Sequence, residues 1–459
     1  MYNDDVMVRV YKIYEEAPSR RIWRFFMRFI IIALVSALVF MQSSYAEKVT
    51  YTKDIAPILF SHCVQCHRPD SVAPMSLLSY KETRPWAKSI REQVGKGQMP
   101  PWSADPKHGV FANDPSLSDE ERQLIIDWVE QGAPQGNPKS MPETPVFEEG
   151  WVLGEPDYII TTPMITVPAT GEDLHIPLRI PVEGDLNRWI RSVEIRPSNL
   201  NVAHHCFVFV NDYGERINNM DYSILAMWGL GTNPTDFPAG TGRQLLATDE
   251  LLIDQHLHST GKEETCVMEI GFYFGEGELV NPLKGMKIGD FDLKIPPHDA
   301  NWETRKFWKT PSDLTIHSLY PHMHYRGKDL RFTAFYPDGT SEILLDVPDY
   351  DFSWQFIYYL ESPKFIPKET TIEVLAHFDN SAGNPDNPDP SIEVLYGENS
   401  EEEMMFGIFE YTSAEIIDVG YFERQHDPES QRNLAIAVMV IGIGLLGSLV
   451  YLNGRQPTV

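Results

Sequence analysis

Hydrophobic positions follow a helical spacing early in the chain and a strand-like spacing afterwards. Within residues 47–136, Ser118-Asp119-Glu120-Glu121 has the sequence of a capping box and opens an apolar helical face that ends at Gly132. From residue 152 to 410 the pattern changes to short β-branched and aromatic runs separated by Pro, Gly, Asn and Asp. The clearest runs are 158–161, 207–210, 270–274, 330–336 and 371–377. Many short strands at this spacing predict antiparallel sandwiches.

Two further apolar stretches lie near the ends of the chain. Arginines precede the run 29–41, and Ser44-Tyr45-Ala46 offers small residues to a signal peptidase. This pattern predicts a signal peptide over residues 1–46, with an uncleaved anchor as the alternative. Residues 434–452 carry no charge and would span roughly 28 Å as a helix. They predict a C-terminal transmembrane helix, and a buried core helix is the alternative reading.

Length and charge limit the organisation and the partners. The 459 residues are too many for one core and predict two or three domains. The formal net charge of −28 argues against nucleic acid as a partner, because phosphate backbones repel such a surface. A proline-rich segment at 136–145 indicates a linker between the helical and strand-like parts.

The segment Cys63-Val64-Gln65-Cys66-His67 is a C-x-x-C-H motif. Its two cysteines can form thioethers to a haem, and its histidine can become the proximal iron ligand. A dithiol redox pair or half of a zinc site are the alternatives, but there is no second C-x-x-C. Met99, held between stiffening prolines and Gln98, is the candidate sixth ligand; Met75 ranks second, and a five-coordinate iron is the remaining alternative.

Two groups of histidines in the later half have the character of copper ligands. In a strand, His322 and His324 would share a face about 6.6 Å apart at a rise of about 3.3 Å per residue. The thioether of Met404 beside two imidazoles favours copper over zinc or magnesium, whereas Met405 would point the opposite way.

The His204-His205 pair has a different geometry, because adjacent strand residues face opposite sides. Both can bind one metal only at a strand end or a bulge. Either His256 or His258 could supply a third imidazole from a neighbouring strand.

These motifs together resemble the copper type II, ascorbate-dependent monooxygenases, the family of peptidylglycine α-hydroxylating and dopamine β-monooxygenases. The matching elements, in order, are His204-His205, Gln255-His256, the His322-x-His324-x-x-Gly327-Lys328 segment and Glu403-Met404. The whole chain, including Met99-Pro100-Pro101-Trp102, resembles bacterial members in which a cytochrome c domain precedes two copper domains.

The resemblance implies a multidomain fold class: a small all-α cytochrome c domain, then two all-β antiparallel jelly-roll-like sandwiches, with a C-terminal transmembrane helix. The expected boundaries are 1–46 for the signal peptide, 47–136 for the cytochrome, 137–149 for the linker, 150–282 and 283–425 for the two β domains and 434–452 for the membrane helix. We therefore expect an exported protein on the periplasmic side of a bacterial membrane, anchored by its C-terminal helix.

The resemblance also implies the cofactors and their ligands. His204, His205 and His256, rather than His258, would hold an electron-donating copper, and His322, His324 and Met404 would hold the copper where oxygen binds. Haem c would be attached covalently through Cys63, Cys66 and His67, with Met99 as its sixth ligand. The implied activity is hydroxylation of a substrate C–H bond with O2. Electrons would come through the fused haem, fed by a cytochrome or quinol-linked donor, or from an ascorbate-like reductant.

Departures from the family pattern bear on the substrate. Tyr320 stands where peptide-amidating members have an arginine that binds the substrate carboxylate, and Phe406 and Ile408 replace a substrate-holding asparagine and tyrosine. The site is therefore more apolar, which favours a small apolar or aromatic substrate over a peptide. Cys206 and Cys266 could form a disulfide, but the sequence does not settle this.

The competing function is a membrane-tethered electron-transfer or copper-handling protein without oxygenase activity. Oxygen uptake coupled to a hydroxylated product would separate the two. Haem-copper nitrite reduction is a weaker alternative, since it needs a type 1 copper with a cysteine ligand and Cys206 is the only candidate.

Overall fold

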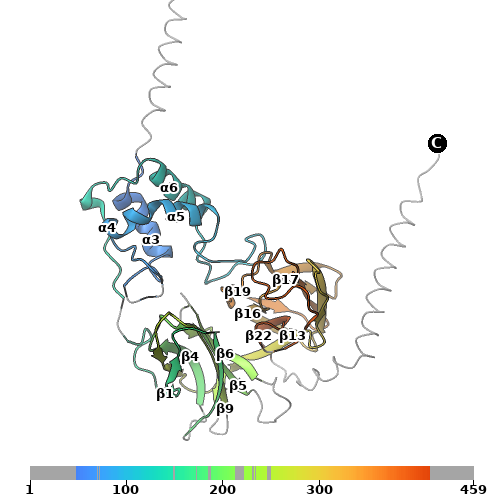
Figure 1. The fold of residues 1–459 in the computed structure, drawn as a ribbon. Coiled ribbons are helices and arrows are strands. Elements are labelled where there is room, and N and C mark those ends of the chain that lie inside the picture. The colour runs from blue at the N-terminus through green and yellow to red at the C-terminus, as the bar shows by residue number, and fades with distance from the viewer. Residues whose placement is uncertain are drawn as a thin grey trace, which may run out of the picture.

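The computed structural model describes residues 48–413, except 70, 72, 148–149, 172, 184–187, 212–221, 230–231, 233, 246–249 and 398 (Figure 1). The expected signal peptide at 1–46 and the apolar stretch 434–452 lie outside the described residues. Among the helices that are described, none is both long and apolar enough to cross a membrane.

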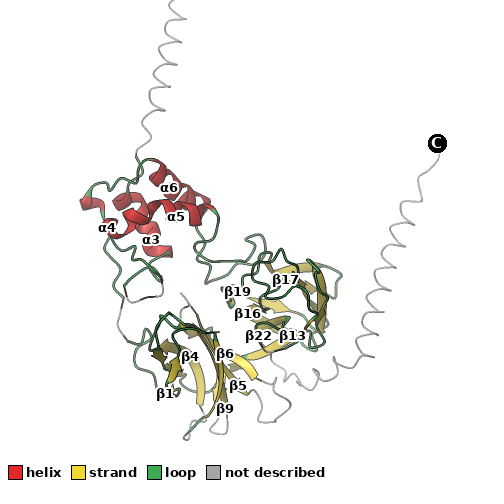
Figure 2. Cartoon of the chain, viewed as in Figure 1, coloured by secondary structure: helices red, strands yellow, loops and turns green. Residues whose placement is uncertain are grey.

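Short helices occupy the N-terminal part and strands the rest (Figure 2). The helices are η1 Tyr51–Ile55, α3 Ala56–His62, α4 Tyr80–Thr83, η2 Arg84–Trp86, α5 Ala87–Gly95, α6 Asp119–Glu130 and η3 Pro138–Ser140. They pack around the buried side chains of Tyr51, Ile125 and Trp128. The predicted capping box is confirmed, because Ser118 and Glu121 each accept a hydrogen bond from the other's backbone N–H.

The first set of strands forms two larger sheets. One has the order β1-β11-β4-β8-β12, with β7 paired to β4, and the other has the order β3-β9-β5-β6. A hydrophobic core drawn from both sheets lies between them. The strands are β1 Tyr158–Thr161, β3 Leu174–Pro181, β4 Arg188–Pro197, β5 Ala203–Asn211, β6 Tyr222–Gly229, β7 Thr235–Asp236, β8 Thr241–Leu245, β9 Glu250–Leu257, β11 Met268–Phe274 and β12 Asn281–Pro282. A small sheet pairs β2 Ile165–Val167 with β10 Glu264–Cys266.

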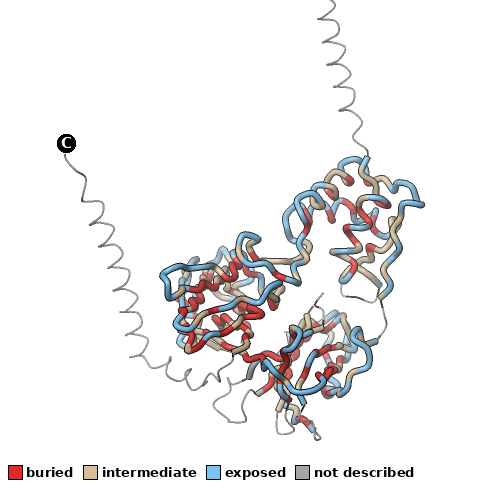
Figure 3. Tube along the Cα trace, turned by 180° about the vertical axis from the view of Figure 1, so that it is seen from behind, coloured by how far each residue is buried: buried red, intermediate tan, exposed pale blue. Residues whose placement is uncertain are grey.

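The second set repeats this arrangement with the orders β13-β22-β16-β19 and β15-β20-β17-β18. Its strands are β13 Lys284–Gly289, β15 Trp302–Lys309, β16 Leu314–His322, β17 Gly327–Phe335, β18 Ser341–Val347, β19 Tyr358–Ile366, β20 Thr371–Phe378 and β22 Phe406–Thr412, and β14 Lys294–Ile295 pairs with β21 Val394–Leu395. Its own core lies between the two sheets. Buried positions alternate with partly exposed ones along β13, whereas β16 is buried at most positions (Figure 3).

The fold class expected from the sequence is wrong. The described chain is mostly β, its α-helices span only four to twelve residues, and none of them could cross a membrane. The sheets are not purely antiparallel, because β12 runs parallel to β8. The expected jelly-roll sandwiches are therefore replaced by four larger sheets and two small ones.

The N-terminal part is also not the separate all-α cytochrome domain that was expected. Its loop at 102–113 leaves the helices and packs on β19, where Phe111 pairs with Leu360. Ala104 and Phe111 are members of the second β core rather than of the helical one. The local sequence of this loop contains no signal for such a distant partner.

Candidate metal centres

Three histidines of the first β part converge on one point. The pairing of β5 with β9 is irregular between Ala203 and His205, which is the bulge that the adjacent pair His204-His205 requires. His256 on β9 lies directly opposite His205. Ligand nitrogens of His204, His205 and His256 all lie within 4.8 Å of one another. The structure thus brings together the three predicted residues and places His256, not His258, in the cluster.

Hydrogen bonds indicate which nitrogens of this cluster are available. His256 donates from Nε2 to the carboxylate of Asp173 at 2.8 Å, so its lone pair is on Nδ1. That Nδ1 is buried and has no hydrogen-bond partner among the described residues. His204 Nδ1 and His205 Nδ1 are 3.2 Å apart. An orphaned buried nitrogen beside two facing ones is costly without a ligand and is satisfied by a shared metal ion.

Burial keeps these imidazoles neutral, which is the form that binds a metal. Loss of solvation lowers the pKa of His204, lowers that of His256 to about 4 and lowers that of His205 well below its usual value. Neighbouring histidines add to the effect at each site.

His322 and His324 form a second pair, although not within one strand as expected. β16 ends at His322, and His324 lies in the turn that follows. Their ring centroids are still 5.2 Å apart. Burial lowers the pKa of His322 to about 3 and that of His324 to about 4, so both are neutral at pH 7.

Each ring of this pair is held through Nδ1, which leaves Nε2 with the lone pair. His322 Nδ1 donates to Gln355 Oε1 at 2.8 Å, and Gln355 Nε2 donates to the Phe352 carbonyl, which fixes the amide orientation. His324 Nδ1 donates to the Glu402 carbonyl at 3.1 Å. The arrangement resembles the way second partners orient metal-binding histidines.

The residues on either side of Met404 contact this pair. The buried carboxylate of Glu403 accepts hydrogen bonds from the backbone N–H of His324 at 2.8 Å and of Arg326 at 2.6 Å. Two residues later, Phe406 pairs with His322 across β22 and β16. Met404 itself is partly exposed, while Met405 is fully buried in the second core. Met404 is therefore the methionine left available to a ligand.

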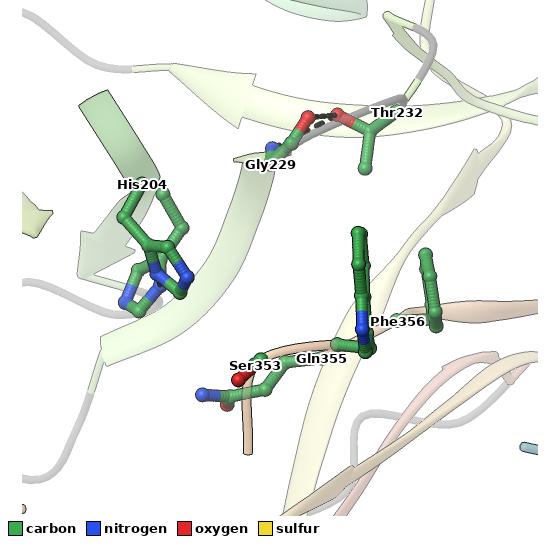
Figure 4. Close-up of a pocket in the computed structure, with 8 residues that line it drawn as sticks. His204, Gly229, Thr232, Ser353, Gln355 and Phe356 are labelled. Atoms are coloured by element: carbon green, nitrogen blue, oxygen red, sulfur yellow. Dashed lines mark hydrogen bonds between the residues drawn. The ribbon is translucent and has the colours of Figure 1, made fainter. Parts of the chain in front are cut away.

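A pocket lies beside the first centre (Figure 4). The space among its lining residues is about 300 Å³ when open solvent is counted, but the room inside for a water-sized molecule is only about 20 Å³. One wall comes from the first β part and the other from the segment 353–356, which includes the Gln355 that bonds His322. The lining residues are His204, His205, Gly229, Thr232, Ser353, Trp354, Gln355 and Phe356.

A fourth histidine, His175, was missed by the sequence analysis. It lies on β3 directly opposite His256, and the two rings stack with centroids 4.2 Å apart. Its Nε2 lies 3.3 Å from the hydroxyl of Ser400, in the second β part. Asp173, Gln355 and Glu403 were also missed as partners of the ligands. The alternation Asp173-x-His175 on one strand face was the available signal, but its register against β9 comes only from the fold.

The C-x-x-C-H segment forms a tight turn after α3. The backbone N–H groups of Cys66 and His67 both donate to the Cys63 carbonyl, at 3.2 and 2.9 Å. His67 Nδ1 lies 3.3 Å from the Met75 carbonyl and donates to it, which leaves the lone pair on Nε2. Both cysteines are partly exposed as residues, yet burial raises the pKa of the Cys63 thiol to about 12 and also raises that of Cys66. Covalent haem attachment with His67 as proximal ligand stays a prediction.

The Met75 carbonyl contacts His67, so Met75 lies on the same side of this turn as His67. This position argues against Met75 as the iron ligand opposite His67. Met99 is partly buried, three residues before Trp102, whose ring packs on that of Tyr358 at 4.7 Å. Its role as sixth ligand stays a prediction. Cys206 and Cys266 are buried free thiols.

Comparison with known proteins does not identify a family. No protein-family model and no curated protein matches the sequence. Among solved structures, the chain is similar to the infectious bursal disease virus VP2 subviral particle at 10% identity and a TM-score of 0.17, covering 56% of this chain and 72% of that one. It is also similar to the PBSX exported protein XepA, at 11% identity and a TM-score of 0.17, covering 52% and 92% of the two chains. Scores this low carry no information about fold or activity.

Proposed function

We propose that this chain is a copper-dependent monooxygenase that hydroxylates a C–H bond of a small apolar or aromatic substrate with O2. One observation carries the proposal: neutral, converging histidines lie on each β part, and the first group lines a pocket whose opposite wall carries the Gln355 that bonds the second group. His204 and His205 line that pocket directly, and Gln355 joins it to His322.

Copper fits the residues of both centres. The buried, unpartnered Nδ1 of His256 supports a metal at the first, and the Met404 thioether beside two imidazoles favours copper at the second. When bound, copper at His322, His324 and Met404 would supply oxygen activation, and copper at His204, His205 and His256 would supply an electron. Overall, one oxygen atom enters the C–H bond and the other leaves as water, with the uptake of two electrons and two protons.

The protein's own residues orient ligands and substrate. Asp173 bonds His256, Gln355 bonds His322, and Glu403 bonds the backbone of His324. Because these bonds already orient the rings, little rearrangement is needed when metal binds. Trp354 and Phe356 give the pocket an aromatic wall. These groups favour an apolar or aromatic substrate over a charged one.

The surroundings of His322 are mostly uncharged, although Lys287 Nζ lies 4.9 Å from the centroid of the neighbouring Phe406 ring. Tyr320 is buried and its hydroxyl donates to Gln355, while the ring of Phe406 stacks on His322 with centroids 6.1 Å apart. No cationic side chain is among the lining residues of the pocket. It is therefore the tyrosine at position 320, where the amidating members have an arginine, that argues against peptide amidation.

A covalent haem at Cys63 and Cys66 is the proposed source of electrons, with an external reductant such as ascorbate as the other route. Replacing both cysteines by alanine should abolish covalent attachment, because both thioethers are lost. Haem that co-migrates with the chain after denaturing electrophoresis is the measurement. Covalent haem in the double variant would refute the attachment site, and the separate Cys206→Ala variant should keep its haem.

The oxygenase proposal is tested by oxygen uptake together with hydroxylated product across a panel of small apolar and aromatic compounds. His324→Ala should abolish both. His258→Gln is the matched control, because His258 lies 6.2 Å from His204 between ring centroids yet outside the converging cluster. Electron relay by the copper-loaded protein without oxygen consumption would instead identify an electron-transfer or copper-handling protein.

A further inference from the structure

His175 occupies a position between the two candidate centres that none of the ligand motifs explains. On one side its ring stacks on His256, at a centroid distance of 4.2 Å and an interplanar angle of 22°. On the other side its Nε2 shares a hydrogen bond with Ser400 Oγ at 3.3 Å. His256 belongs to the first β part, and Ser400 precedes Met404 in the second. One side chain thus contacts a ligand of the first centre and the ligand-bearing loop of the second.

The loop that receives this contact is otherwise tied to the second centre. Glu402 accepts from His324 Nδ1 at 3.1 Å, and Glu403 accepts from the His324 backbone at 2.8 Å. A movement of Ser400 would therefore be felt at both His324 and Met404.

The opposite end of the path is equally constrained. His256 is held by Asp173 through Nε2, and its Nδ1 is the nitrogen available to the first metal. Metal at that site would fix the ring of His256, and the stacked ring of His175 would have fewer orientations open to it. Ordering one partner lowers the entropy cost of ordering the next, which produces positive coupling between sites.

We infer that His175 is a positioning residue that couples the two copper centres, so that filling the three-histidine site strengthens copper binding at His322, His324 and Met404. This inference rests on the proposed function for the identity of the metal. The coupling passes through one hydrogen bond, which contributes about 0.5–1.5 kcal/mol net, so the expected effect is about 2- to 10-fold in affinity. His175 touches no substrate in this role.

The test is Cu(I) binding by the full-length protein, measured by competition with a chromophoric chelator. The coupling is the ratio of two Cu(I) affinities of the second centre. One affinity comes from the second binding step of the unmodified protein. The other comes from His205→Ala, in which the first centre is broken. We expect a ratio of about 2 to 10 in the unmodified background. In His175→Phe, which keeps a stacking ring but cannot bond Ser400, the ratio should fall to about one.

Ser400→Ala tests the same bond from the other side and serves if His175→Phe fails to fold. The double variant should lose no more coupling than either single variant, since both remove one interaction. Ser391→Ala is the matched control, because the Ser391 hydroxyl donates to Asp389 within its own loop. Equal loss in Ser391→Ala, or a ratio of one in the unmodified protein, would overturn the coupling. Absence of Cu(I) binding at both centres would instead refute the proposed function.

Discussion

At the scale of single residues, His256, His322 and His324 share one feature: a second group fixes one ring nitrogen and leaves the other available to a metal. Asp173 does this for His256, Gln355 for His322 and the Glu402 carbonyl for His324. Each bond selects a tautomer and a ring orientation. The first centre therefore presents Nδ1 of His256, whereas the second presents Nε2 of its two histidines.

Met404→Ile tests the methionine of the second centre. Isoleucine keeps the apolar volume but removes the sulfur, so product formation should fall at least about tenfold while the three-histidine site still binds copper. The measurements are turnover and copper content per chain. Met405→Ile is the control; it alters a fully buried core position and should change stability rather than chemistry. Loss of turnover in Met405→Ile, with Met404→Ile unaffected, would show that Met405 rather than Met404 is the ligand.

Asp173→Ala should weaken copper binding at the three-histidine site by about 10- to 100-fold, because His256 loses the partner that sets its tautomer. Chelator competition measures the change in copper affinity. Asp173→Asn keeps a hydrogen-bond acceptor but not the charge, so its copper affinity should lie between those of the unmodified protein and Asp173→Ala. Glu250 lies on β9, the strand that carries His256, and forms an ion pair with Arg179. Glu250→Ala removes this carboxylate and should leave the copper affinity unchanged. An unaltered affinity in Asp173→Ala would exclude this orienting role.

At the scale of elements, the hydrophobic pattern of the sequence correctly predicted several strands. The run 158–161 coincides with β1, and those at 207–210 and 371–377 lie within β5 and β20, because their alternating residues face a core on one side. The turn containing His324 was not predicted, since Glu403, which holds it, is 79 residues away. The register of β3 against β9, which places His175 opposite His256, could likewise not be predicted from the sequence.

Ser118→Ala tests the predicted start of α6. The variant removes one half of the capping box and should destabilise the first turn by about 1 kcal/mol. Amide hydrogen exchange in that turn should accelerate about fivefold, the factor that corresponds to this free energy. Ser140→Ala, at an exposed serine outside α3–α6, should leave exchange in α6 unchanged. Unchanged exchange in Ser118→Ala would mean that packing of Ile125 and Trp128 alone holds the helix.

At the scale of the whole molecule, the helices and the second β part are joined by a packed loop rather than by a flexible linker alone. Asn113 donates to the Ile357 carbonyl at 2.8 Å and accepts from the Tyr359 N–H at 3.1 Å. Trp102 packs on Phe356, with ring centroids 5.7 Å apart, and Phe356 lines the pocket beside His204 and His205. The segment that carries Met99 thus leads directly to the pocket wall.

If the proposed haem is attached at Cys63 and Cys66, this contact would bring its segment of the chain close to the first candidate copper centre. Tethering raises the effective concentration of donor at acceptor, and a methionine-ligated haem has a potential high enough to receive electrons from other cytochromes. In rapid mixing of the protein carrying reduced haem and Cu(II), the haem should reoxidise without a mediator. The rate should collapse, by at least about tenfold, when His204 and His205 are both replaced by alanine, because the acceptor is lost. His258→Gln, outside the cluster, should keep the original rate, and an equal rate in the His204/His205 variant would show that the electrons go elsewhere.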